Sequence, residues 1–379
     1  MKRSSILVLL VGLLSYSIPP ALAASKIGSG CKHAGDILQL SAGNLICTKV
    51  GKVLKFEKPK SISKPTNSAT ISNVDPIVFK AFNSYNHEAC KGKHPNFTAK
   101  YLTSPGYSTA LLAQQKVLFE QAMSCYNSYF EHPVVINIAL VNEDDYEFLV
   151  SQKSNGLPVF DEIQLRWAKF MMSRLSSGAG SFAGSAGWSI PSTSAWVLMI
   201  DSSFSSSPNA HGAAHEFVHI LQSYSKSPFF PYYGDGSTSA DYVNMPTWFW
   251  EGTGELLSYE SISGDVSEFS ENMHEVRNQG QESPSLNKIK TEDQVVATFE
   301  ALENPNGQEA NMMCYAIGSV MSEYILANFG YEKYFQIMKN AGVYRDFSEN
   351  LKATIGLTSH DLYVSAAPFV LSQWKQNFS

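Results

Sequence analysis

The sequence predicts an α+β protein in which a small disulfide-tied β module precedes a larger domain, which has a small sheet with helices and then mainly helices. Two runs rich in β-branched and apolar residues, 134–141 and 195–202, are typical of buried strands. Elsewhere, apolar residues recur at three-to-four spacing, which is typical of helices. A hydrophobic content of 44% and an aromatic content of 12% suffice for a large core.

The first 23 residues have the features of a signal peptide. Lys2 and Arg3 precede an apolar core that is too short to span a bilayer comfortably, and residues 19–23, Pro-Pro-Ala-Leu-Ala, are typical of a cleavage region. The alternative is an uncleaved membrane anchor, which this cleavage region disfavours. We therefore expect a secreted or extracellular protein that begins at Ala24 and has no transmembrane segment after cleavage.

The charge of the chain argues against a nucleic-acid partner. The formal net charge is −6, and it becomes −8 when Lys2 and Arg3 are removed. The sequence has no dense basic run of the kind that binds phosphate backbones. The mature length of about 355 residues is compatible with one large two-lobed domain or with two ordinary domains.

Five cysteines in an exported chain predict disulfides with one cysteine left over. Proximity along the chain favours the pairs Cys31–Cys47 and Cys90–Cys125. Cys314 is then the odd residue. Its apolar neighbours on a predicted helix favour a buried, inert thiol over a nucleophile.

The N-terminal part divides into two segments. Residues 24–57 contain short apolar-polar alternations separated by glycines, which predicts a small β module with a role in spacing or surface attachment. Residues 58–75 are rich in Lys, Pro, Ser, Thr and Asn, which predicts a flexible linker. The main domain is therefore expected over residues 76–379.

The main domain is expected to open with a helix, on one face of which lie Leu111, Leu118, Ala122, Cys125 and Tyr129. After the strand at 134–141, we expect a helix capped by Asn142 and an amphipathic helix over 161–175. The Gly/Ser/Ala-rich residues 176–187 predict a loop or a close-approach hairpin. The strand at 195–202 then comes shortly before the segment that carries the chemistry.

That segment is Ala-Ala-His-Glu-Phe-Val-His-Ile-Leu-Gln, residues 213–222. On a helix, His215 and His219 project side by side from one face and can share one metal ion. Glu216 is offset so that it can act as general base on a water at that metal. The alternative is an ordinary core helix with satisfied histidines. The apolar neighbours favour the metal, because burying two histidines and a glutamate is costly unless they are paired or coordinated.

A third ligand is needed, and the stretch 245–260 supplies the candidates. Its aromatic run, 248–250, predicts a second buried helix, on which Glu251 and Glu255 share a face. One acid can bind the metal while the other accepts the N–H of a ligand histidine. The alternative for each is a solvated carboxylate. His211 is rejected as a ligand because ~8 residues of helix span ~12 Å.

These residues resemble the gluzincin metallopeptidases, the broad peptidase MA-like group. The resemblance rests on His-Glu-Phe-Val-His at 215–219 and on Trp-Glu-Gly-x-x-Glu at 250–255. It implies a thermolysin-like two-lobed catalytic domain and a Zn²⁺ cofactor. It also implies that Glu251 is the third zinc ligand and that Glu255 is the acid that supports a ligand histidine.

The resemblance extends from about residue 134 to the C-terminus. A Tyr-x-x-Gly pattern at 315–318 is similar to the one that supplies the oxyanion-binding tyrosine, which would be Tyr315 here. Aminopeptidase relatives have a lysine where this chain has Ile317, and their Gly-x-Met-Glu-Asn motif is absent, so the resemblance implies an endopeptidase. The strand at 195–202 resembles the edge strand along which gluzincins bind an extended peptide.

The expected function is therefore that of a secreted zinc peptidase acting on a peptide or protein substrate. Glu216 is expected to move the proton and Tyr315 to bind the oxyanion. Two other classes stay open: a surface-binding protein with a structural or vestigial zinc, anchored through residues 24–57, and a zinc hydrolase acting on a non-peptide substrate. The aromatic residues at 229–233 are expected to line substrate pockets or to form a structural cap.

Overall fold

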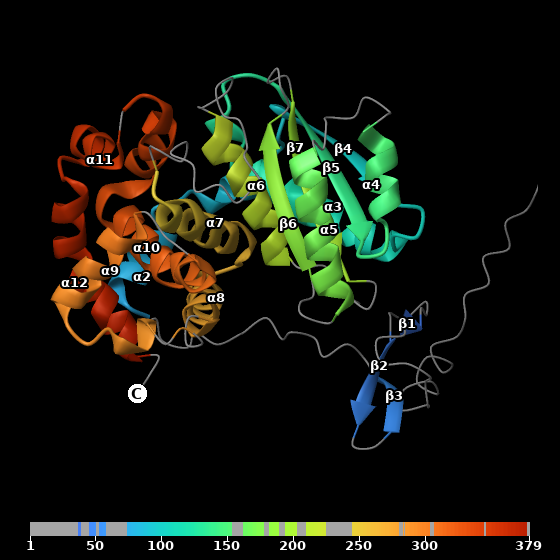
Figure 1. Ribbon diagram of the computed structural model, residues 1–379, viewed down its shortest axis with the longest axis horizontal. Coiled ribbons are helices and arrows are strands. Elements are labelled where there is room, and N and C mark those ends of the chain that lie inside the picture. Colours follow the sequence, from blue (N-terminus) through green and yellow to red (C-terminus); the bar gives the residue numbers. More distant parts are fainter. Residues whose placement is uncertain are drawn as a thin grey trace, which may run out of the picture. The chain divides into compact units, whose positions relative to one another are not determined.

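The computed structural model describes two units of the chain, residues 1–73 and 74–379, which we treat separately (Figure 1). The residues described are 37–38, 45–50, 53–57, 74–153, 162–177, 182–188, 194–202, 210–224, 245–279, 283, 285–303, 307–344 and 346–376. The predicted signal peptide, Cys31, most of the predicted linker and the aromatic residues at 229–233 lie outside them.

The first unit contains three short antiparallel strands in the order β1-β2-β3. They are β1 (Ile37–Leu38), β2 (Leu45–Val50) and β3 (Val53–Glu57). All three fall within the segment predicted as a β module. Cys47 lies in β2 opposite Phe56 of β3. Its pairing with Cys31 stays a prediction.

The second unit is α+β, as predicted, and mostly helical. Its sheet has the order β4-β5-β7-β6, in which β4 (Phe97–Thr103), β5 (Val134–Asn142) and β7 (Ala195–Asp201) are parallel. Strand β6 (Phe182–Trp188) pairs antiparallel with β7. Helix α3 (Thr109–Cys125) connects β4 to β5, which is the crossover that a parallel pair requires.

Helices cover both faces of this sheet. Residues 196, 198 and 200 of β7 pack against α4 (Tyr146–Lys153) and α5 (Glu162–Ser176), whereas residues 195, 197 and 199 face the main core, which includes α3 and α6 (Ala210–Tyr224). Every residue of β7 is therefore buried. Burial on both faces explains why this strand is a continuous apolar run rather than an alternating one.

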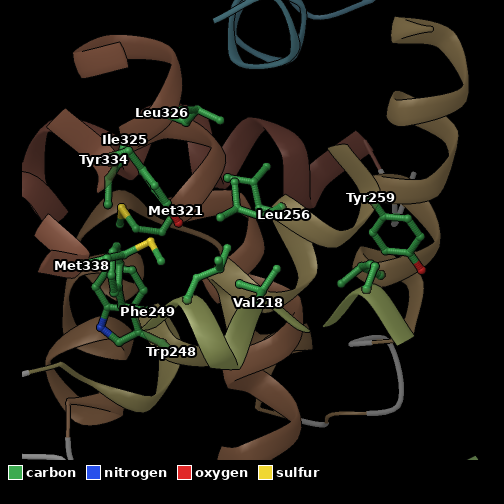
Figure 2. Close-up of a cluster of buried hydrophobic side chains, with 14 of the residues drawn as sticks. Val218, Trp248, Phe249, Leu256, Tyr259, Met321, Ile325, Leu326, Tyr334 and Met338 are labelled. Carbon is green, nitrogen blue, oxygen red and sulfur yellow. The ribbon is translucent and has the colours of Figure 1, made fainter. Parts of the chain in front are cut away.

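The remaining helices pack together beyond α6 (Figure 1). They are α2 (Pro76–Phe82), α7 (Thr247–Ile262), α8 (Val266–Gln279), α9 (Glu292–Leu302), α10 (Gly307–Lys339), α11 (Phe347–Ile355) and α12 (Ser359–Gln376), with 3-10 turns at His87–Lys91, Asn127–Tyr129, Leu286–Lys288 and Asn340–Gly342. Helix α10 is kinked at Gly330, where φ is 78°. Helix α7 contacts both α6 and α10 and therefore joins α6 to the helical core. Figure 2 shows that core, in which Trp248, Phe249 and Leu256 of α7 lie near Met321 and Ile325 of α10.

One prediction about the strands is wrong, because β7, which was expected to be the edge strand, lies between β5 and β6. Of the two alternatives for residues 176–187, the close-approach hairpin is confirmed, because β6 pairs antiparallel with the next strand, β7. The small residues of β6 are typical of turns, but here they serve a close approach. A Cβ added to Gly184 would lie 2.4 Å from the Oε1 atom of Glu216. β6 is thus the strand at the end of the sheet, next to α6.

One predicted helix start is also wrong. Asn142 does not cap a helix, because it is the last residue of β5 and pairs with Asp201 of β7, and α4 begins at Tyr146. Asp75, the last residue of the predicted linker, caps α2 by accepting a hydrogen bond of 2.8 Å from the N–H of Ile77.

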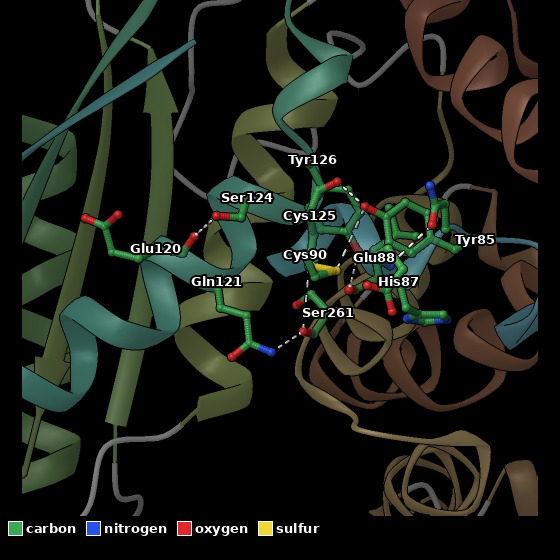
Figure 3. Close-up of a disulfide and its surroundings, with 12 residues drawn as sticks. Tyr85, His87, Glu88, Cys90, Glu120, Gln121, Ser124, Cys125, Tyr126 and Ser261 are labelled. Carbon is green, nitrogen blue, oxygen red and sulfur yellow. Dashed lines mark hydrogen bonds between the residues drawn. A yellow bond between two sulfur atoms is a disulfide. The ribbon is translucent and has the colours of Figure 1, made fainter. Parts of the chain in front are cut away.

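The disulfide Cys90–Cys125 is present as predicted, and it joins the turn at His87–Lys91 to the end of α3 (Figure 3). The hydroxyl of Tyr85 donates a hydrogen bond to the carbonyl of Cys125. Cys314 is a free, buried cysteine, also as predicted. Burial and the nearby Glu251 raise the pKa of its thiol to about 12, so Cys314 is an inert thiol at neutral pH.

Helices α7 and α10 touch backbone to backbone at two glycines. A Cβ added to Gly252 would lie 2.2 Å from the carbonyl carbon of Gly318, and one added to Gly318 would lie 2.3 Å from the carbonyl oxygen of Trp248. Neither position has room for a side chain. The contact brings Glu251 of α7, which directly precedes Gly252, close to the segment of α10 that carries Tyr315.

We predict that Gly318→Ala destabilises the protein by about 1–3 kcal/mol, because the added methyl group must push α7 and α10 apart. In an unobstructed helix the same change would stabilise the protein by about 1 kcal/mol. The sign of the change in the free energy of unfolding therefore distinguishes the two cases. Urea unfolding measures it. Gly106→Ala is the control, because the nearest neighbour of its Cβ is 3.8 Å away. A Gly318→Ala protein as stable as wild type would contradict the close contact.

Candidate metal centre

Helix α6 buries its apolar residues and with them the two motif histidines. Phe217 and Val218 are fully buried, and His215 and His219 are 5% and 8% exposed. Because the histidines are one turn apart, they share the face that packs against α7. The structure therefore places two imidazoles at the contact between the two helices.

Three possible ligand atoms converge at this contact. The Nε2 atoms of His215 and His219 are 3.1 Å apart, and the Oε2 atom of Glu251 lies 3.3 Å from the first and 3.6 Å from the second. A tetrahedral ion with bonds of about 2.0–2.1 Å separates its ligand atoms by about 3.3–3.4 Å. The spacing therefore suits one metal ion.

The outer nitrogen of His219 is held by Gln222. The Nδ1 atom of His219 is 2.7 Å from the Oε1 atom of Gln222, and the amide Nε2 of Gln222 donates a hydrogen bond of 2.8 Å to the carbonyl of Trp250. Since the amide nitrogen is committed to that carbonyl, the amide oxygen faces the histidine as an acceptor. The proton of His219 is then on Nδ1, and the lone pair of Nε2 faces the cluster.

The outer nitrogen of His215 faces a carboxylate. Its Nδ1 atom lies 3.2 Å from the Oε1 atom of Glu255, which is 4% exposed. The other oxygen of Glu255, Oε2, lies 2.9 Å from the Nε2 atom of His211. His211 is in the first turn of α6, and its Nε2 faces this carboxylate. His211, His215 and Glu255 thus form a second group, which shares His215 with the first.

The charges of the two groups depend on one another. Burial raises the pKa of Glu251, but hydrogen bonds from His215 and His219 outweigh burial and lower it. Burial lowers the pKa of His215, but its bonds to Glu251 and Glu255 raise it well above 6.5. The two carboxylates therefore favour a positive charge between them, which a proton or a divalent cation can supply.

Glu216 lies beside the convergent atoms without joining them. It is 7% exposed, and its carboxylate lies against Gly184 of β6. The Oε2 atom has no hydrogen-bond partner. Burial raises the pKa of this carboxyl group, in spite of the neighbouring histidines. Glu216 is therefore a carboxyl group with an oxygen that is available to a proton donor.

Tyr315 borders the same cluster. Its ring stacks on that of His215, with centroids 5.8 Å apart and planes 18° apart. Burial and the charges of Glu251 and Glu216 raise the pKa of the phenol well above 10. Its hydroxyl is therefore a proton donor at neutral pH. Six side chains predicted for the site meet here: His215, Glu216, His219, Glu251, Glu255 and Tyr315.

Several residues that shape this site were missed in the sequence. A Cβ on Gly254 would lie 2.6 Å from Cε1 of His215, so the ring needs this glycine, and Trp250 stacks on His219 at 5.2 Å and 11°. Gln222 could have been found, because it lies three residues after His219 on the same helix. Gly184 could not, since only the sheet topology brings it to Glu216.

Comparisons with protein-family models, with curated proteins and with solved structures gave no match. The chemistry of the centre is therefore argued from its geometry alone.

We predict that the protein binds one divalent metal ion per chain and that Glu251→Gln weakens binding by more than the ~10–100-fold typical of residues outside the coordination shell. Competition with a coloured chelator measures the affinity. Glu260→Gln is the matched control, because Glu260 is a buried glutamate of the same helix that has no hydrogen-bond partner and is not part of the cluster. Equal affinities in the Glu251→Gln and wild-type proteins would remove Glu251 from the ligand set.

Proposed function

We propose that the protein is a zinc-dependent peptidase of the gluzincin type. One observation carries the proposal: the Nε2 atoms of His215 and His219 and a carboxylate oxygen of Glu251 converge within 3.6 Å, and the buried Glu216 lies next to them with an unpartnered oxygen. The first three provide a metal site, and the fourth provides a base. No sequence match is needed for this reasoning.

The ion is assigned to His215, His219 and Glu251 rather than to the overlapping group of His211, His215 and Glu255. A neutral imidazole has one lone pair, so His215 can bind a metal through only one nitrogen. Gln222 directs the lone pair of His219 toward the first group. When His215 also uses Nε2, its Nδ1–H lies toward Glu255, whose Oε1 atom is 3.2 Å away.

The donor set favours zinc and a catalytic site. Two imidazole nitrogens and one carboxylate oxygen are typical ligands of catalytic zinc, whereas structural zinc takes four protein ligands. Among the residues that the structure describes, no fourth His, Cys, Asp or Glu joins the group. A fourth tetrahedral position is thus left for water, which favours an enzyme over a binding protein with structural zinc.

The proposed mechanism divides the proton transfers and the charge stabilisation between two side chains. Bound zinc would lower the pKa of a water and polarise the scissile carbonyl. Glu216 would accept a proton from the attacking water on its unpartnered oxygen and would deliver it to the leaving amine. Tyr315, which is protonated at neutral pH, donates a hydrogen bond to the oxyanion that develops on the carbonyl oxygen.

The position of β6 supports an extended peptide as substrate. β6 is last in the strand order, and Glu216 lies against its Gly184. An edge strand offers backbone N–H and C=O groups with which a peptide can pair irrespective of its sequence. We therefore assign to β6 the substrate-binding role expected for residues 195–202. The sheet on one side of α6 and the helices on the other support a two-lobed, thermolysin-like arrangement, and endopeptidase activity is part of the proposal.

Export is also part of the proposal. The disulfide Cys90–Cys125 supports an oxidising compartment such as the cell exterior. None of the described helices has the length and apolar character that a membrane crossing needs. Attachment to the cell surface is assigned to the module at 24–57.

We predict that Glu216→Gln keeps zinc binding and the fold but reduces peptide hydrolysis by at least ~10²–10⁴-fold, because both proton transfers depend on Glu216. Digestion of casein and of a peptide library by the zinc-loaded protein measures this. Glu260→Gln, which changes another buried glutamate, should leave hydrolysis intact.

Undiminished turnover by the Glu216→Gln protein would refute the mechanism. A zinc-loaded wild-type protein that cleaves esters or cell-wall fragments but no peptide would refute the substrate class and keep the hydrolytic centre.

A further inference from the structure

His211 lies outside the proposed coordination shell, yet α7 holds it in place through two contacts. Its ring stacks on that of Tyr259, with centroids 4.2 Å apart and planes 11° apart. Its Nε2 atom lies 2.9 Å from the Oε2 atom of Glu255. The side chain is 19% exposed. The ring of His211 thus has an aromatic neighbour on its face and a carboxylate at ion-pair distance from its edge.

Glu255 lies between two histidines and offers one oxygen to each. Oε2 faces His211 and Oε1 faces Nδ1 of His215, at 2.9 and 3.2 Å. Because a carboxylate is planar, fixing one oxygen also fixes the direction of the other. Without His211, the buried Oε2 would lose its partner, which is costly, and the carboxylate could turn away from His215. The position of His215 therefore depends on His211 through Glu255.

We propose that His211 is a positioning residue of the metal centre, which acts through Glu255 to hold the His215 ring so that its Nε2 faces the ion. The inference rests on the proposed function, since it assumes an ion at His215, His219 and Glu251. His211 would thus be a residue of α6 that affects metal binding without coordinating the ion. Residues that orient a ligand typically change metal affinity ~10–100-fold when they are removed.

A competing assignment makes His211 a ligand itself. His211, His215 and Glu255 lie close enough together to hold a second cation. Such a site would need a lone pair on Nδ1 of His215 while Nε2 binds the first ion, so the imidazole would have to lose both protons. The positioning role needs only the neutral form. The two assignments differ in the number of ions bound per chain.

The test compares His211→Phe with His211→Gln in the full-length chain. Phenylalanine keeps a ring to stack on Tyr259 and removes the nitrogen, whereas glutamine keeps an N–H donor. We expect His211→Phe to bind zinc ~10–100-fold more weakly in chelator competition, and His211→Gln to recover part of this loss. The visible spectrum of the Co²⁺-loaded protein should shift in His211→Phe, because the geometry of a ligand changes. His360→Phe, at an exposed histidine paired with Glu300, should match wild type.

Each outcome supports or overturns a specific statement. Wild-type zinc affinity and an unchanged cobalt spectrum in His211→Phe would overturn the positioning role and leave the proposed function intact. Two zinc ions per wild-type chain, one of them lost in both variants, would overturn it in favour of a second metal site. If wild type bound no zinc, the proposed function itself would fail. If the His211→Phe protein does not fold, His211→Gln decides: zinc affinity below that of wild type would support the role, and wild-type affinity with an unchanged cobalt spectrum would overturn it, because glutamine is expected to recover only part of the loss.

Discussion

The structure depends on four polar side chains that lie where α6 meets α7. Apolar residues of both helices bury His215, His219 and Glu255, and Glu251 is partly buried beside them. Burying such groups is costly unless each finds a complementary charge. The two carboxylates favour a positive charge between them, which a proton on a histidine or a divalent cation can supply. In the proposed function that charge is a metal ion.

Four glycines make this arrangement sterically possible. Gly252 lets α7 touch α10 at Gly318, and Gly254 leaves room for the ring of His215. Gly184 does the same for Glu216 at the last strand of the sheet. Gly252 directly follows Glu251, and Gly318 lies three residues after Tyr315. Because these two glycines belong to the same contact between α7 and α10, the packing of the helices links the positions of Glu251 and Tyr315. The site is therefore assembled from the sheet, α6, α7 and α10 at once.

Local periodicity explains what could be predicted from the sequence. The spacing of four residues placed His215 beside His219 and Glu251 beside Glu255, and apolar runs located β5 and β7. Other features that depend on tertiary contact were missed or wrong. The small residues of β6 are needed because β6 packs closely against α6, and this contact cannot be seen in the sequence. Likewise, Gln222 and His211 have their partners on α7, so their roles depend on how α6 and α7 pack. Family membership stays a proposal, because the comparisons gave no match.

The most direct test of the metal centre is the X-ray absorption spectrum of the zinc-loaded protein at the zinc edge. Our account predicts a four-coordinate shell of nitrogen and oxygen atoms at about 2.0–2.1 Å, with the outer-shell scattering of two imidazoles and no sulfur. The two remaining oxygens would come from Glu251 and water. A sulfur neighbour at about 2.3 Å, or a shell without imidazole scattering, would contradict the assignment of zinc to His215, His219 and Glu251.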